Sequence, residues 1–335
     1  MSRRVRLVAS IIGLLLFVLI VWRAGPARLV AGLGAAWWVF ALLVPLWVLV
    51  YACNAAAWRL LTSDGSARVP FLRALAITVS TFALNYATPM ASFGGEPLKV
   101  LAATPWLGSR RAVGSVVAFR LLHSLSHVLA CLLALVPAAL LLPRMPALDA
   151  GLAVAGVGLV VTALFLLSRH REGLFVQVLG LLGRVPLLGR VVRRLRPEAG
   201  VLRELDAHLT SIYSSAPGRF RAALVTELAG RLLTVSEFTL IMWALGLGFH
   251  PLAGFVAGAL SSLLTNLVAF IPFELGTKEG SLYLIFGWLG FDPSVGVQAA
   301  LVSRLRELCW MALGIGLLWL AGDRATTRLG VRSTS

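Results

Sequence analysis

Charged residues are scarce in this chain. Asp, Glu, Lys and Arg make up 13% of its 335 residues, whereas soluble domains carry about 25%. Hydrophobic residues reach 59%, and apolar runs of at least about 18 residues, enough to cross a bilayer, recur along the whole length. Composition therefore excludes a soluble protein and leaves no room for a separate soluble domain. We predict an all-α polytopic membrane protein.

Sequence patterns that mark several enzyme classes are also missing. The chain has no GxxxxGK[ST] phosphate loop, and neither the GxSxG nor the HExxH pattern of hydrolases. Its cysteines, Cys53, Cys131 and Cys309, lie in apolar segments without paired spacing, which argues against a disulfide framework or a zinc site. We therefore expect no ATP hydrolysis, no enzymatic activity, no cofactor and no bound metal.

Six apolar runs are predicted as full spans, at residues 7–22, 37–61, 112–142, 150–168, 222–246 and 294–320. The first run follows Arg3, Arg4 and Arg6, so it fits either a signal peptide or an uncleaved span. Because Trp22 and Arg23 follow it, rather than a small-residue cleavage site, we favour the uncleaved span.

Two further apolar stretches, 72–107 and 252–290, are each interrupted near the middle by proline, glycine and charge. Each half has about 15 residues, too few to span the bilayer at about 1.5 Å per residue. One interpretation is a pair of re-entrant helical hairpins, and the alternative is two ordinary kinked spans. We favour the hairpins. Their turns are expected to contain Pro89, Gly94 and Gly95 in the first, and Pro272 and Gly276 in the second.

Basic residues set the expected orientation. The net charge is +16, and arginine accumulates between the apolar runs, which is a topology signal rather than a nucleic-acid footprint. Segment 169–221 has ten Arg against four acidic residues, so this segment and both termini are predicted to be cytoplasmic. The two hairpins would then enter from opposite faces, as in transporters built from inverted repeats.

The whole chain, 1–335, is thus predicted to be a single integral membrane domain. It comprises a first half (1–168) with hairpin 72–107, a basic cytoplasmic loop (169–221) and a second half (222–322) with hairpin 252–290. In the loop, Val201, Leu205, Leu209 and Ile212 recur at helical spacing, which is typical of a helix lying on an anionic leaflet.

Twelve charged residues fall inside the predicted spans and hairpins. They are Glu96, Glu227, Glu237, Glu274, Glu279, Glu307, Lys99, Arg120, Arg231, Lys278, Arg304 and Arg306. Because an ionised group near the bilayer centre costs at least about 2.5 kcal/mol, these groups must face one another or water in a polar interior. Helical spacing predicts the pairs Glu96–Lys99, Arg304–Glu307 and Glu227–Arg231. The last pair is open to a purely structural interpretation. Glu237 has no local partner and is assigned to the cavity.

Two further features of the sequence point to candidate site residues. The only two lysines, Lys99 and Lys278, lie one in each interrupted stretch. Arg120, His123 and His127 follow i, i+3, i+7 and form a polar stripe, which lines a cavity or hydrogen-bonds a neighbouring helix. No set of carboxylates accompanies the stripe, so it does not predict a metal site.

Three segments together resemble the lysylphosphatidylglycerol synthase membrane-domain family, also called flippase-like. They are "TPMASFGGEPLKV" (88–100), "VVAFRLLHSLSHVLACLLAL" (116–135) and "IPFELGTKEGSLYLIF" (271–286). The carried-over positions are Pro89, Gly95, Glu96, Lys99, Arg120, Pro272, Gly276 and Glu279. Lys99 replaces the usual Arg, His123 replaces a common acidic residue, and Glu274 is an extra charge, so the headgroup preference is open.

The resemblance implies a lipid flippase of the bacterial inner membrane that moves an anionic phospholipid or a polyprenyl-phosphate-linked lipid. Lys99, Arg120, Lys278 and Arg304 would neutralise the phosphate, Glu96 and Glu279 would orient the lysines, and Glu237 and Glu274 would complete the substrate site. The chain ends 15 residues after the last predicted span, so we expect no aminoacyl transferase domain.

Two other functions stay open. One is a non-transporting scaffold that presents lipid to an envelope biosynthesis enzyme. The other is an intramembrane lipid transferase, for which His123 and His127 are the only candidate residues. Besides membrane lipid, the partners left open are such enzymes and a second copy of the chain. The coupling of transport to protons or ions is also open.

Overall fold

The computed structural model contains helices and no strands in the part of the chain that it describes. That part comprises residues 36–62, 68–87, 94–168, 217–267 and 276–328, with isolated positions 22, 27, 30, 34 and 274. Side chains beyond residue 320 are not described. The predicted all-α class is therefore confirmed over these residues.

Nine α-helices and one 3-10 helix make up the described residues. They are η1 (Trp37–Val39), α3 (Phe40–Thr62), α4 (Phe71–Ala87), α5 (Glu96–Leu107), α6 (Ser109–Leu141), α7 (Pro146–Ser168), α11 (Pro217–Ala244), α12 (Pro251–Leu267), α13 (Thr277–Trp288) and α14 (Pro293–Arg328). Proline begins α7, α11, α12 and α14, because its fixed φ suits the first helical turn and its missing N–H is not needed there. At the start of α14, Asp292 Oδ1 also accepts the N–H of Ser294 at 2.8 Å.

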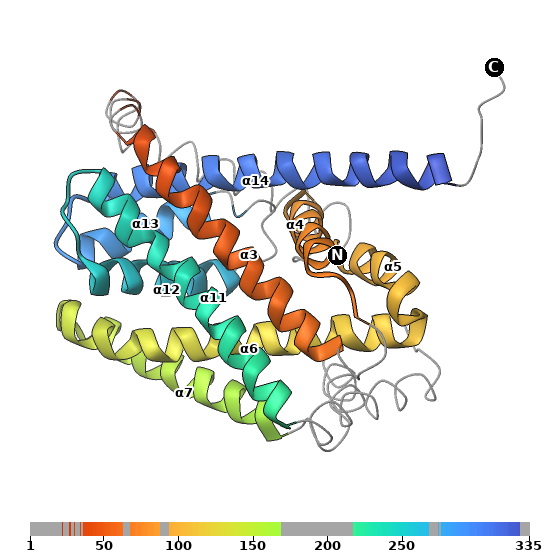
Figure 1. The fold of residues 1–335 in the computed structure, drawn as a ribbon. Helices are drawn as coiled ribbons and strands as arrows, with labels where there is room; N and C mark the ends of the chain where they lie inside the picture. Colours follow the sequence, from red (N-terminus) through yellow and green to blue (C-terminus); the bar gives the residue numbers. More distant parts are fainter. Residues whose placement is uncertain are drawn as a thin grey trace, which may run out of the picture.

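The helices form two sets with the same order (Figure 1). We call α3–α6 the first set and α11–α14 the second set. α3 and α11 lie side by side and run in opposite directions, and α6 and α14 are also oppositely directed. α4 packs on α14 and α12 packs on α6, so one short helix of each set contacts the long helix of the other. α7 packs along α6.

Each interrupted stretch forms two separate helices. α4 and α12 both have 17 residues, and α5 and α13 both have 12. These lengths correspond to about 26 Å and about 18 Å, less than the hydrocarbon core of about 30 Å. Pro89 and Pro272 lie outside the described residues. The helix breaks are thus confirmed, whereas the re-entrant insertion stays a prediction.

Three predicted spans, 37–61, 112–142 and 150–168, correspond to helices long and apolar enough to cross a membrane. Runs 222–246 and 294–320 correspond to α11 and α14, which have 28 and 36 residues. Among the described helices these two do not reach the same apolarity, because they carry buried charge. Run 7–22 lies outside the described residues except for Trp22.

Two helices begin well before the apolar runs that were predicted as spans. α11 begins at Pro217, inside the predicted cytoplasmic loop, and α7 begins at Pro146 rather than at residue 150. In both cases the proline starts the helix, and the continuous apolar run begins several residues further along the same helix. The rest of the predicted loop, residues 169–216, lies outside the described residues.

The outer face of α7 is apolar. Val154 is 73% exposed and Val157 is 67% exposed, and Val161 and Leu164 are also exposed. An apolar face of this size is unfavourable in water, whereas hydrocarbon solvates it at no cost. The face is therefore suited to contact lipid.

α14 and α4 approach closely at Gly314. A Cβ placed there would lie 2.6 Å from the Cβ of Ala83 and 2.7 Å from the carbonyl oxygen of Val79. The hydroxyl of Ser80 donates to the carbonyl of Gly314 at 3.2 Å, which is feasible only while the two backbones stay close. Small residues such as glycine allow helix backbones to approach this closely in membranes, where helix association depends on packing rather than on the hydrophobic effect.

Gly314→Ala should therefore destabilise the protein by about 1–3 kcal/mol, the usual cost of overpacking. Gly316, two residues on, is the matched control, because a Cβ there meets nothing within 4 Å. Gly316→Ala should be neutral or stabilising, since Ala exceeds Gly in helix propensity by about 1 kcal/mol. Thermal unfolding of both variants in detergent measures the difference, and equal melting temperatures would contradict the close contact.

Candidate functional site

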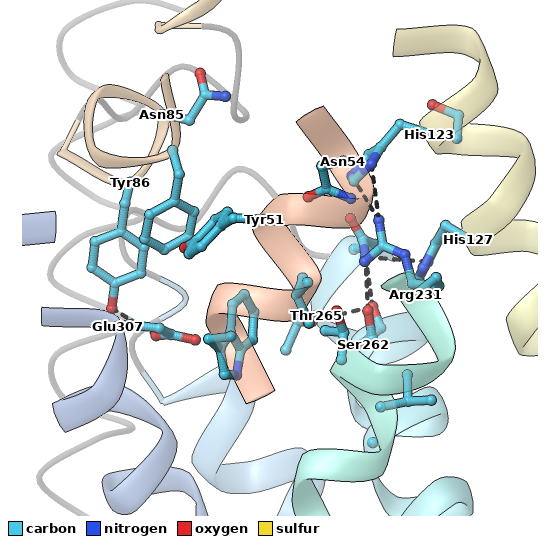
Figure 2. A pocket seen from close by; sticks show the side chains of 18 of the residues that line it. Tyr51, Asn54, Asn85, Tyr86, His123, His127, Arg231, Ser262, Thr265 and Glu307 are labelled. Carbon is cyan, nitrogen blue, oxygen red and sulfur yellow. Dashed lines mark hydrogen bonds between the residues drawn. The ribbon is translucent and has the colours of Figure 1, made fainter. Parts of the chain in front are cut away.

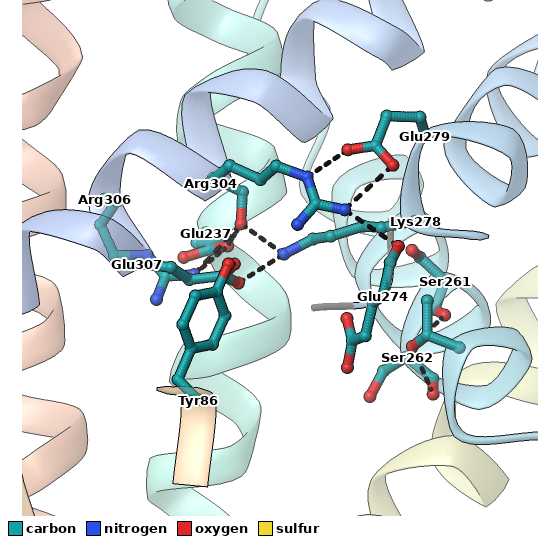
Figure 3. Close-up of polar contacts among 12 residues, drawn as sticks. Tyr86, Glu237, Ser261, Ser262, Glu274, Lys278, Glu279, Arg304, Arg306 and Glu307 are labelled. Carbon is teal, nitrogen blue, oxygen red and sulfur yellow. Dashed lines mark hydrogen bonds and ion pairs between the residues drawn. The ribbon is translucent and has the colours of Figure 1, made fainter. Parts of the chain in front are cut away.

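A cavity of about 570 Å³ lies between the two helix sets. Six of the eight predicted substrate-binding residues line it: Glu96, Lys99, Arg120, Glu237, Glu274 and Lys278. The other two, Glu279 and Arg304, do not line it and instead pair with each other beside Lys278 (Figure 3). The structure thus gathers residues from both interrupted stretches around one space.

Four charged residues form a cluster at the second-set end of the cavity, which we call the α14 charge cluster: Glu237, Lys278, Arg306 and Glu307 (Figure 3). Lys278 Nζ lies 2.6 Å from Glu307 Oε1 and donates to Ser303 Oγ at 2.8 Å. Arg306 Nη2 donates to Glu237 Oε1 at 3.1 Å. Two cations and two carboxylates cancel, which makes their burial tolerable.

Aromatic residues of the first set complete this cluster. Trp47 Nε1 donates to Glu237 Oε2, and the guanidinium of Arg306 lies 3.6 Å from the centre of the Trp47 ring. Tyr86 donates its hydroxyl proton to Glu307 Oε2 at 2.9 Å. The carboxylates of one set are therefore held in part by donors of the other.

Glu279 has a different partner from the predicted one. It was expected to orient a lysine, but its carboxylate pairs with Arg304, with Nη2 and Oε2 3.0 Å apart. It also accepts the N–H of Gly276 at 2.9 Å and so caps the start of α13. Arg304 Nη2 donates further to the carbonyl of Glu274, which has a positive φ of 52°. The Arg304–Glu279 pair thus fixes the turn before α13.

The first set has an equivalent pair. Glu96, at the start of α5, lies 3.7 Å from Arg120. Arg120 is the twelfth residue of α6, as Arg304 is the twelfth residue of α14. The turn before α5 is fixed by Asn85, whose Oδ1 accepts the N–H of Gly95 at 2.7 Å. The same acid–arginine connection therefore links short helix to long helix in both sets.

Lys99 is not paired with Glu96 as spacing had suggested. Its side chain is buried, 2% exposed, and its Nζ lies 3.7 Å from the ring centre of Phe119 and 4.4 Å from that of Trp58. Among the described residues it has no carboxylate partner. Aromatic faces stabilise the ammonium by cation–π attraction, worth about 2 kcal/mol when desolvated. Its charge is therefore stabilised but not neutralised, in contrast to that of Lys278.

Glu227 and Arg231 are joined through His123 rather than directly. Figure 2 shows His123 beside Arg231. His123 Nδ1 lies 2.6 Å from Glu227 Oε1, and its Nε2 lies 2.6 Å from Arg231 Nη2. Asn54 Nδ2 lies 3.0 Å from both oxygens of Glu227. The predicted i, i+4 pair was therefore wrong in its contact, because a residue of α6 inserts between its members. His127 lies one turn further on and contacts Asn266 at 3.4 Å.

Several lining residues were missed from the sequence. Ser261, Ser262, Thr265 and Asn266 form a polar stripe on α12, and their spacing in "SSLLTN" was a usable signal. Trp47, Asn54 and Tyr86 gave no such signal, since each is a single polar or aromatic residue in an apolar run. Within the described residues, no group of His, Cys, Asp or Glu is arranged to hold a metal ion.

The chain belongs to the family described as the lysylphosphatidylglycerol synthase transmembrane region, whose model matches residues 7–316. This confirms the resemblance inferred from the three sequence segments. The family comprises membrane domains related to lipid handling. No curated protein and no solved structure matches the chain.

The Arg304–Glu279 pair should contribute strongly to stability, because Glu279 is fully buried. Glu279→Gln leaves the arginine charge without its carboxylate and should destabilise by about 3 kcal/mol or more. The control is Asp149→Asn, which breaks the exposed Arg144–Asp149 pair and should change stability by less than about 1 kcal/mol. Thermal unfolding in detergent compares the two, and similar losses would refute a structural role for Glu279.

Proposed function

We propose that this chain moves an anionic lipid, a phospholipid or a polyprenyl-phosphate-linked lipid, between the leaflets of the bacterial inner membrane. The observation that carries the proposal is a charged cavity inside a helical bundle with an apolar outer face. Such a space admits a polar headgroup while the acyl or prenyl tails stay in hydrocarbon. Membership of a lipid-related membrane family supports the same substrate class.

The charges around the cavity support an anionic substrate. Lys99 and Arg231 have no carboxylate partner among the described residues, and Arg120 lies close to the same end of the space. An entering phosphate would replace the aromatic and imidazole contacts of these cations with ion pairs. We propose a transport role without catalysis, with lipid as the partner.

The two helix sets support transport by an inverted repeat. They share helix order, the lengths of their short helices and the acid–arginine connection, and α3 and α6 run opposite to α11 and α14. We propose that the α4–α5 and α12–α13 pairs are re-entrant hairpins that enter from opposite faces, with both termini cytoplasmic. The cavity between them would then lie near the midplane, as in other transporters of this kind.

Labelling from one side of the membrane tests this topology. In a background without Cys53, Cys131 and Cys309, single cysteines at Asp149 and Arg196 should react with impermeant reagent from opposite sides, Asp149 from the periplasm. Reaction of both positions from the periplasm would exclude the proposed orientation.

Lipid movement in proteoliposomes tests the activity. The wild-type protein should move a fluorescent anionic phospholipid or polyprenyl phosphate faster than protein-free vesicles, without ATP. Lys99→Gln should reduce the rate at least about tenfold, because a single desolvated ion pair is worth more than about 1.4 kcal/mol. Lys99→Arg should retain part of it, since the charge remains.

Arg144→Gln is the control, because Arg144 is exposed and does not line the cavity. It should transport at the wild-type rate. Folded wild-type protein that moves none of a panel of headgroups would reject the transport proposal and favour the scaffold role instead.

A further inference from the structure

The contacts of His123 determine which of its nitrogens carries hydrogen. A guanidinium has only donors, so Nε2, which lies 2.6 Å from Arg231 Nη2, must be an acceptor without a proton. Nδ1 then carries the hydrogen and donates it to Glu227, 2.6 Å away. In this arrangement, therefore, the imidazole is neutral and Arg231 occupies the one position where it could take a second proton.

Arg231 is itself incompletely satisfied. Among the described residues it forms no ion pair, its Nη2 contacts only the neutral ring of His123, and its buried Nε has no hydrogen-bond partner. Its side chain lines the cavity (Figure 2). A partly buried guanidinium without a carboxylate and with a buried, unused N–H donor is unfavourable, and an anion in the cavity would relieve both deficits.

The charged side chains around the cavity balance one another. Its lining has the cations Lys99, Arg120, Arg231, Lys278 and Arg306 and the carboxylates Glu96, Glu237, Glu274 and Glu307. Glu227, fully buried behind His123, supplies the fifth carboxylate. With neutral histidines the formal charge is zero, so a monoanion that entered alone would leave an uncompensated charge, which a low-dielectric site resists.

We infer that a phosphodiester anion binds at Arg231 together with one proton, which His123 takes up. When the anion pairs with Arg231, Nε2 loses its donor and becomes free to accept a proton, while Glu227 on the opposite side stabilises the imidazolium. The anion and the proton together add no net charge to the cavity. Because such linkage is reciprocal, acid strengthens anion binding and the anion strengthens proton binding.

The other groups near His123 allow this change. On α6, Arg120 and His127 flank it. From α11, Glu227 and Arg231 contact His123. From α3, only the uncharged Asn54 lies close, and it donates to the Glu227 carboxylate. Lys99 on α5 lies against Phe119, whose ring centre is 5.9 Å from that of His123. The nearby cations oppose protonation of His123, and a bound anion offsets them.

The identity of the anion as a lipid headgroup rests on the proposed function. The coupling of anion binding to proton uptake does not depend on that function. The probes are dihexanoyl phosphatidylglycerol and its free headgroup, glycerophosphoglycerol. Both are phosphodiesters, which do not titrate near neutral pH, so any proton taken up enters the protein. Calorimetry on the full chain in detergent, in two buffers of different ionisation enthalpy, counts the protons taken up per ligand bound.

For the wild-type protein we expect about one proton taken up per phosphodiester, and an affinity that rises up to about tenfold per pH unit between about pH 8 and about pH 6. His123→Asn should bind without proton uptake and without this pH dependence. Arg231→Gln should weaken binding at least about tenfold. His127→Asn, which changes the next histidine on the same helix, should keep the proton uptake.

Proton uptake that survives His123→Asn, or that His127→Asn removes, would overturn the assignment to His123. Wild-type binding without proton uptake, no binding of either probe, or unchanged affinity in Arg231→Gln would overturn the site itself. Equal affinity for the two probes would keep the phosphodiester site but reject a lipid source. Binding with proton uptake in a protein that moves no lipid would reject the proposed function and leave this inference intact.

Discussion

The cost of burying charge in a membrane governs this structure. Each ionised group away from water loses several kcal/mol of hydration, and only partners at hydrogen-bonding distance restore it. The chain meets this constraint by directing its charges inward from α5, α6, α11, α13 and α14 to a shared interior. The long helices α11 and α14 can therefore carry charge while other helices present apolar faces outward.

Two lysines with similar sequence surroundings meet the constraint in different ways. Lys278 is neutralised by Glu307 at 2.6 Å, whereas Lys99 lies against aromatic rings without a carboxylate. Pairing fixes a charge in place, because separating the pair leaves two uncompensated ions. Aromatic faces attract the ammonium more weakly and leave it free to pair with an anion. The first set thus supplies the more available cation, and the second set the more rigid cluster.

The fold could be predicted well from the sequence, because membrane spans depend on local hydropathy. The broken stretches were visible for the same reason, since proline, glycine and charge interrupt the apolar pattern between α4 and α5 and between α12 and α13. Helix starts at Pro146 and Pro217 were placed too late, because hydropathy changes only after the helix has begun.

The composition of the site was also largely predictable, but its pairing was not. Helical spacing finds partners within one helix, whereas the closest ion-pair partners of Glu96, Glu279 and Glu307 lie on other helices. Insertion of His123 between Glu227 and Arg231 depends on how α6 packs against α11, which no local pattern encodes. A buried charge therefore indicates that a partner exists without saying which helix supplies it.

The contact surface between the first set (α3–α6) and the second set (α11–α14), which we call the seam, differs from the interior of each set in its polar contacts. Among the described residues, every ion pair between a carboxylate and a Lys or Arg at the cavity joins members of one set: Glu96–Arg120 in the first, and Lys278–Glu307, Arg304–Glu279, Arg306–Glu237 and Arg306–Glu307 in the second. Hydrogen bonds cross the seam instead, and those made by a charged group join it to a neutral one, as in Trp47–Glu237, Tyr86–Glu307 and Asn54–Glu227.

Such bonds are worth about 1.5–3 kcal/mol each, against about 3–5 kcal/mol for breaking a buried ion pair. Sliding one set past the other would therefore exchange hydrogen bonds without pulling opposite charges apart. Along this seam the bundle can shear while these ion pairs stay intact.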